Sequence, residues 1–132
     1  MEVIRRILVT GACGFIGRHV VRRLAALGHT VYGIDSLDER VHPSGQPPAF
    51  PDGVIFHRCS VDAIPYEYRR ECSVAIHLAA QVSVTDSMAD YKRYLDQNTY
   101  QTGVLLNDLR CNPNLDRLVV ASSMSVYGAG GP

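Results

Sequence analysis

The chain has 132 residues, of which 46% are hydrophobic, enough for one domain with a buried core. Thirteen basic residues balance thirteen acidic ones, so no strong electric field favours nucleic acid or an anionic membrane as a partner. Gly11 and Gly14 interrupt the first apolar run too early for a signal peptide, and no apolar stretch is long enough to span a membrane.

The cysteines give no sign of a metal centre or a disulfide framework. Four of them are scattered along the chain without a Cys-x-x-Cys pair, and the histidines do not cluster at metal-ligand spacing. This usage is typical of reduced, mostly buried cysteines in a cytoplasmic protein. We therefore expect no metal site and a cytoplasmic location.

Strands are predicted to alternate with helices along the whole chain. Apolar runs predict five strands, at residues 4–10, 30–34, 54–59, 74–79 and 118–122. Helical spacing predicts helices at residues 14–27, 65–71 and 86–110, the last being one bent helix or two consecutive ones. This alternation predicts an α/β fold built on a parallel sheet with right-handed crossovers.

Apolar spacing also predicts which helix faces are buried. In the first helix the apolar face consists of Ile16, Val20, Leu24 and Leu27. In the last helical stretch one face carries Leu95, Thr102, Leu105, Leu106 and Leu109. The polar, proline-rich residues 36–53 predict a long surface loop between the second and third strands.

A glycine-rich turn joins the first strand to the first helix. Residues 11–17 read GACGFIG, with glycines spaced Gly-x-x-Gly-x-x-Gly. A dinucleotide needs its pyrophosphate held against the NH groups at a helix amino terminus, and side chains at these glycine positions would block that approach. The turn therefore predicts a dinucleotide site at the carboxyl ends of the strands.

Asp35 closes the second strand, 24 positions after Gly11. An acidic residue near this spacing accepts hydrogen bonds from the adenosine ribose and repels a 2′-phosphate, which favours NAD over NADP. The alternative is that Asp35 only caps the following turn. Arg40, in the next loop, is an alternative partner for a 2′-phosphate but lies farther from the strand end.

Five motifs occur in order along the chain: VTGACGFIG at 9–17, GIDSL at 33–37, HLAA at 77–80, NTYQTGVLL at 98–106 and SSMSVYG at 122–128. Together they resemble the motifs of the extended short-chain dehydrogenases/reductases that act on nucleotide sugars, the epimerases and dehydratases of the UDP-glucose 4-epimerase type. The resemblance covers nearly the whole chain. It implies a Rossmann-type doubly wound sheet with strand order 3-2-1-4-5, NAD as cofactor and a nucleotide-diphosphate sugar as substrate.

The resemblance also implies which residues line the cofactor. The pyrophosphate would lie along Gly11, Gly14, Phe15, Ile16 and Gly17, and the adenosine ribose at Asp35 and Ser36. Ser60 and Val61 would meet the adenine edge; serine replaces the family's usual aspartate, and Asp62 is its possible substitute. Other cofactor contacts would come from Leu78, Ala79, Ala80, Val82 and Ser122.

Polar residues in the later motifs have structural alternatives. Asn98 would order the backbone of the loop after the fourth strand, beside the cofactor. Ser123 would be catalytic and bind the reacting sugar hydroxyl; its alternative is a strand-end serine bonded to backbone. Ser83 and Ser87 are candidate substrate contacts. His77 is expected to be a core histidine.

The family's catalytic pair is missing. A tyrosine phenolate acts as base in this family, and a lysine four residues later lowers its pKa, but no Tyr-x-x-x-Lys occurs in this chain. Tyr66 to Arg70 has an arginine at that spacing but precedes the fourth strand, and Tyr127 belongs to the SVYG motif. We therefore expect residues 1–132 to be an incomplete NAD(P)-binding domain without later strands or a substrate domain, inactive alone.

The sequence favours one function and leaves others open. The first is the NAD-binding half of a nucleotide-sugar epimerase, with possible homodimerisation of a full-length enzyme. Dehydratases of the family place an Asp-Glu pair beside the serine motif, whereas here Met124 and Ser125 follow Ser123. The alternatives are a non-catalytic NAD-sensing or interaction module, and a family dehydratase or reductase acting on another substrate.

Overall fold

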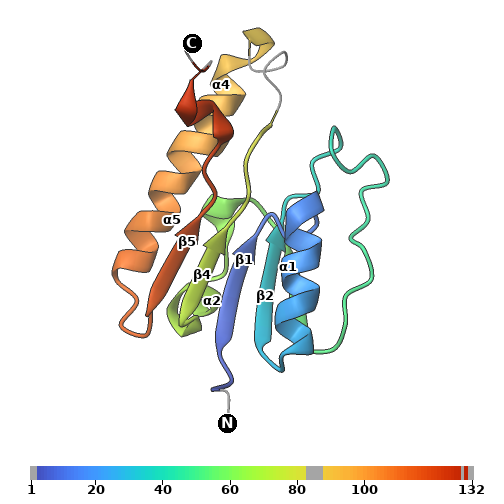
Figure 1. The fold of residues 1–132 in the computed structure, drawn as a ribbon, viewed down its shortest axis with the longest axis vertical. Coiled ribbons are helices and arrows are strands. Elements are labelled where there is room, and N and C mark those ends of the chain that lie inside the picture. The colour runs from blue at the N-terminus through green and yellow to red at the C-terminus, as the bar shows by residue number, and fades with distance from the viewer. Residues whose placement is uncertain (1–2, 83–87, 129, 131–132) are drawn as a thin grey trace.

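The computed structural model describes residues 3–82, 88–128 and 130, and its centre is one five-stranded sheet (Figure 1). The strands are β1 (Arg6–Thr10), β2 (Thr30–Asp35), β3 (Val54–Arg58), β4 (Val74–His77) and β5 (Arg117–Val120). All pairings are parallel and the spatial order is β3-β2-β1-β4-β5. The predicted doubly wound topology is therefore confirmed.

Helices cover both faces of this sheet. The helix α1 (Phe15–Ala26) lies on one face, and α2 (Tyr66–Glu71) and α5 (Gln101–Arg110) lie on the other (Figure 1). A short helix α4 (Tyr91–Tyr94) runs through a π-helical turn, η2 (Leu95–Tyr100), directly into α5. Two 3₁₀ turns, η1 (Val61–Ala63) and η3 (Met124–Tyr127), follow β3 and β5. None of the described helices is long and apolar enough to cross a membrane.

Side chains of β1 alternate between two apolar clusters. Leu8 is fully buried with Leu105 and Leu109 of α5, whereas Val9 is fully buried with Val21 of α1. Each such side chain contributes about 1.5–3 kcal/mol relative to an exposed one. Burial on both faces explains why the strand is a continuous apolar run. The glycine turn begins directly after this buried strand, at Gly11.

Two details of helix burial differ from the prediction. Leu95 and Leu106 were expected on the buried face with Leu105 and Leu109, but they are 63% and 44% exposed. Leu95 begins the π-helical turn, whose angle per residue differs from that of α5, so its side chain falls out of phase with the buried face of α5. Leu106 follows the buried Leu105 directly and therefore points in another direction. In α1 the buried residues are Gly17 and Val21, while the predicted apolar residues Ile16 and Leu27 are exposed.

Candidate functional site

The glycine turn packs closely against the segment that follows β4. Gly11 has φ +70°, and a Cβ there would lie 2.8 Å from the backbone nitrogen of Ala79. A Cβ on Gly17 would lie 1.9 Å from the carbonyl oxygen of Gly11. Only glycine fits either position without moving backbone. The turn therefore brings the start of α1 close to the carboxyl ends of β1 and β4.

The amino terminus of α1 is open to a ligand. Its N-cap residue Gly14 has no side chain to cap the helix, and the first turn contains no acidic residue. The first NH groups of a helix have no partner within the helix and carry the positive end of its dipole. The side chains of Phe15 and Ile16 are 76% and 62% exposed beside them. This geometry suits an anion such as a pyrophosphate.

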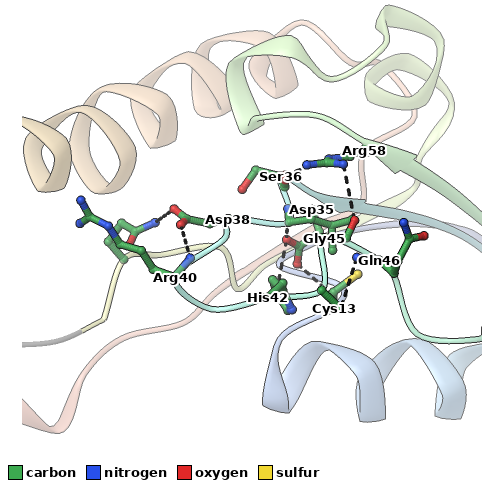
Figure 2. Close-up of polar contacts among 12 residues, drawn as sticks. Cys13, Asp35, Ser36, Asp38, Arg40, His42, Gly45, Gln46 and Arg58 are labelled. Carbon is green, nitrogen blue, oxygen red and sulfur yellow. Dashed lines mark hydrogen bonds and ion pairs between the residues drawn. The ribbon is translucent and has the colours of Figure 1, made fainter.

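Asp35 connects the end of β2 to the glycine turn (Figure 2). One carboxylate oxygen accepts a hydrogen bond from the backbone NH of Cys13 and the other from that of Leu37, both at 2.9 Å. The capping role considered for Asp35 is therefore present. A carboxylate has about four acceptor sites, so capacity remains for ribose hydroxyls. Nε2 of His42 lies 3.7 Å from the same carboxylate.

Arg40 extends away from Asp35 in Figure 2. Its guanidinium lies 4.0 Å from the carboxylate of Asp90, the N-cap residue of α4. It is therefore directed toward α4 rather than toward the end of β2. This position disfavours the alternative in which Arg40 binds a 2′-phosphate beside Asp35.

One cavity of about 430 Å³ unites most of the predicted cofactor residues. Those that line it are Gly11, Gly14, Phe15, Ile16, Gly17, Asp35, Ser36, Ser60, Val61, Leu78, Ala79, Ala80 and Val82. They come from the ends of β1, β2, β3 and β4. Among the described residues, Asp62, Asn98, Ser122 and Ser123 do not line it. Ser83 and Ser87 lie outside the described residues.

Other lining residues were not predicted from the sequence. They are Ile34, Asp38, Val41, His42, Cys59, Gln81, Gln97, Gln101 and Ala121. Two of them, Cys59 and Ala121, directly follow a strand, and that position is the sequence signal that could have found them. The loop at 36–53 gave no such signal because its composition indicates only a surface segment, whereas part of it turns toward the cavity.

The polar groups predicted at the adenine edge already have protein partners. The backbone NH of Val61 donates to Oε1 of Gln101 at 3.2 Å, and Gln101 is only 8% exposed. The hydroxyl of Ser60 donates to the carboxylate of Asp62 at 2.5 Å. An adenine that used either group would have to replace a protein hydrogen bond.

Asn98 forms the expected tie to the loop after β4. Its Oδ1 accepts from the backbone NH of Gln81 at 2.7 Å, and its Nδ2 donates to the carbonyl of the same residue at 3.0 Å. These two hydrogen bonds satisfy the amide of Asn98 and fix the backbone of Gln81, the residue after Ala80. Asn98 lies in the π-helical turn, and such turns are frequent at functional sites.

His77 is buried, as expected for a core histidine, and is 5% exposed. Its Nδ1 lies 2.7 Å from the hydroxyl of Thr10, and its Nε2 lies 2.9 Å from that of Thr102. Burial lowers the pKa of the imidazole from its ordinary value. The Thr10 hydroxyl also accepts from the backbone NH of Ala79 at 3.2 Å. The ring thus links β1, β4 and α5 through the hydroxyls of Thr10 and Thr102.

Ser123 is exposed and caps the short turn η3. Its hydroxyl accepts from the backbone NH of Ser125 at 3.1 Å and lies 3.1 Å from that residue's hydroxyl. This local bonding is the structural alternative considered for a strand-end serine. Tyr127, four positions later, is 87% exposed.

The buried cysteine beside the site is not an activated nucleophile. Cys13 lies in the glycine turn, and burial together with the Asp35 carboxylate raises the pKa of its thiol to about 12. A protonated thiol is a poor nucleophile. In the part of the chain that the structure describes, no group of three or more His, Cys, Asp or Glu residues is arranged to hold a metal ion.

Almost the whole chain matches the model of one protein family. Residues 7–132 match the family described as "NAD dependent epimerase/dehydratase family". The chain belongs to this family. The match includes the glycine turn, Asp35 and the segments after β4 and β5.

Curated proteins and a solved structure resemble the chain in sequence and fold. Protein CapI of Staphylococcus aureus is 31% identical, and a probable UDP-glucuronate 4-epimerase of Rhizobium meliloti is 35% identical; each alignment covers 94% of this chain. The chain spans 39% of the length of each of these relatives. The solved structure of MoeE5 in complex with UDP-glucuronic acid and NAD is 31% identical, with a TM-score of 0.79, covering 96% of this chain and 39% of MoeE5.

Proposed function

We propose that this chain is the NAD-binding part of a nucleotide-sugar epimerase. The observation that carries the proposal is the single cavity shared by the glycine turn, Asp35 and the segment after β4. Those elements match the parts of a dinucleotide: an uncapped helix amino terminus for the pyrophosphate, a carboxylate for the ribose and an apolar wall beyond it. The NAD named for the family and for MoeE5 supports the same choice of cofactor.

Different residues of the chain bind different parts of NAD. The first turn of α1 holds the pyrophosphate, Asp35 and Ser36 hold the adenosine ribose, and Ala79 and Ala80 pack along the cofactor. Asn98 orders the backbone beside it. When bound, NAD would supply the hydride acceptor for oxidation at C4 of a nucleotide sugar. Ser123 holds the reacting sugar hydroxyl.

Calorimetric titration with NAD and NADP tests the binding proposal. We expect NAD to bind more tightly than NADP, and Gly14→Val to weaken NAD binding at least about tenfold. Gly14 has extended backbone angles, and a Cβ there meets only the Gly11 carbonyl oxygen, at 3.3 Å, so the variant should fold. Gly103→Ala is the matched control because a Cβ there meets nothing within 4 Å. Absent NAD binding, or equal binding by Gly14→Val, would refute the proposal.

A second assay separates binding from turnover. The chain contains no Tyr-x-x-x-Lys to supply the base, and a tyrosine near its ordinary pKa of about 10 is a poor base at neutral pH. We expect the purified 132-residue chain to bind NAD but to leave UDP-glucose and UDP-glucuronic acid unchanged. Epimerised product formed at a rate above a no-enzyme control would contradict this part of the proposal.

A further inference from the structure

The loop after β2 is tied to the far side of the cavity by Asp38. Its carboxylate forms an ion pair with Arg93 of α4 and accepts from Nε2 of Gln81 at 3.0 Å. The side chains of Asp38 and Arg93 are only 15% and 21% exposed, so solvent screens this pair less than an ordinary surface pair. Asp38 also accepts from the backbone NH of Arg40 at 3.0 Å, which fixes the turn of the loop (Figure 2).

A second ion pair of opposite polarity joins the same two segments. Arg40 of the loop lies 4.0 Å from Asp90 of α4. Asp90 in turn caps α4 by accepting from the backbone NH of Arg93 at 3.2 Å. In the loop, acidic Asp38 faces basic Arg93, and basic Arg40 faces acidic Asp90. Opposed pairs of this kind favour one register of the loop against α4, because sliding would bring like charges together.

The root of the loop is held in an unfavourable backbone conformation. Leu37 has φ +53°, which is rare for a residue other than glycine, and its side chain is 1% exposed. Such a conformation costs about 1–3 kcal/mol and persists only where the surroundings impose it. Burial of the leucine and the bond from its NH to Asp35 impose it here. This turn aims the next residue, Asp38, at α4.

The loop after β2 and the segment after β4 both line the cavity. Val41 and His42 line it from the loop, and Gln81 and Gln97 line it from the segment after β4. Gln81 donates both to Asp38, at 3.0 Å, and to Oε1 of Gln97, at 2.5 Å. The wall formed by the loop therefore has its position set by Asp38 rather than by packing of the loop alone.

We infer that Asp38 and Arg93 are positioning residues for the dinucleotide: their pair holds the loop so that Val41 and His42 form one wall of the adenosine end of the site. The inference rests on the proposed NAD binding. A wall ordered before binding spares the ligand the cost of ordering it, so the pair strengthens affinity by holding the loop in place.

The test combines NAD calorimetry with amide hydrogen exchange of the NAD-free chain. For Asp38→Asn we expect NAD affinity to fall about fivefold and exchange to rise at residues 36–46, with β1 and β2 unchanged. Glu39→Gln is the matched control: it removes the same charge from an exposed neighbour in the same loop, and both readouts should stay at wild-type values.

Variants of Arg93 distinguish positioning from general loss of structure. We expect Arg93→Gln to reproduce the Asp38→Asn values, the double variant to add little to either, and Arg93→Lys to recover most of the affinity. The inference is overturned if Asp38→Asn binds NAD like the wild type, or if exchange rises while affinity does not change. A wild-type chain that fails to bind NAD refutes the proposed function instead.

Discussion

The backbone NH of Cys13 donates a 2.9 Å hydrogen bond to the carboxylate of Asp35, which ties the glycine turn to the end of β2. The other carboxylate oxygen accepts from Leu37, where the loop over the cavity begins. A single side chain thus fixes two walls of the candidate site. In the proposed function its negative charge also favours NAD over NADP.

Asp35→Asn should affect stability and nucleotide preference together. An amide has one acceptor oxygen where the carboxylate has two, so one backbone donor loses its partner, at a cost of about 1–3 kcal/mol. Removal of the negative charge should also narrow the preference for NAD over NADP about tenfold. Urea unfolding followed by circular dichroism, with calorimetry for both nucleotides, measures the two effects.

Asp52→Asn is the control for that experiment, since it removes the same charge from an exposed position in the same loop. It should change neither the free energy of unfolding nor the nucleotide preference. If Asp35→Asn kept the wild-type preference, the discriminating role of Asp35 would be wrong, whatever its effect on stability.

Gly17→Ala should destabilise the fold through a clash with the backbone of the glycine turn. The added Cβ would lie 1.9 Å from the Gly11 carbonyl oxygen, so backbone must move, at a cost of about 3 kcal/mol. Gly103→Ala, in the exposed part of α5, should instead be neutral or stabilise by up to about 1 kcal/mol. Chemical denaturation compares the two. Similar free energies of unfolding for both variants would show that the turn is not packed as described.

His77 should make stability depend on pH in weakly acidic solution. Burial lowers its pKa in the folded chain, so the unfolded chain binds more protons between that lowered value and the ordinary value of about 6.5. Stability should therefore be fully present above about pH 6.5 and fall as the pH drops below it. His77→Gln should flatten this part of the pH profile, while exposed His19→Gln should leave it unchanged. An unaltered slope in His77→Gln would assign the effect to other groups.

The sequence predicts the sheet and most of the cofactor wall because both depend on local signals. Buried parallel strands are continuous apolar runs, and the glycines of the turn and Asp35 occupy fixed positions relative to strand ends. These local signals place Gly11 and Asp35 at one edge of the sheet, the family resemblance adds Ala79, and all three line one cavity.

The roles of Asp38 and Gln101 could not be predicted in this way. Asp38 depends on Arg93, 55 positions later, and Gln101 depends on the NH of Val61, 40 positions earlier. Nothing in the local composition of either segment indicates such a partner. The burial of Leu95 was predicted wrongly because a π-helical turn leaves no clear pattern in apolar spacing.

Residue-resolved NMR of the chain during titration with NAD tests the proposed site most directly. We predict that the amide signals that shift belong to residues 11–17, Asp35, Ser36 and residues 78–80, with much smaller shifts at an equal concentration of NADP. The smaller cavity beside Tyr66, Arg70 and Cys111, lined by α2 and the end of α5, serves as an internal reference and should not respond. Shifts confined to that second cavity, or no shifts at all, would contradict the assignment of the glycine turn and Asp35 to a dinucleotide.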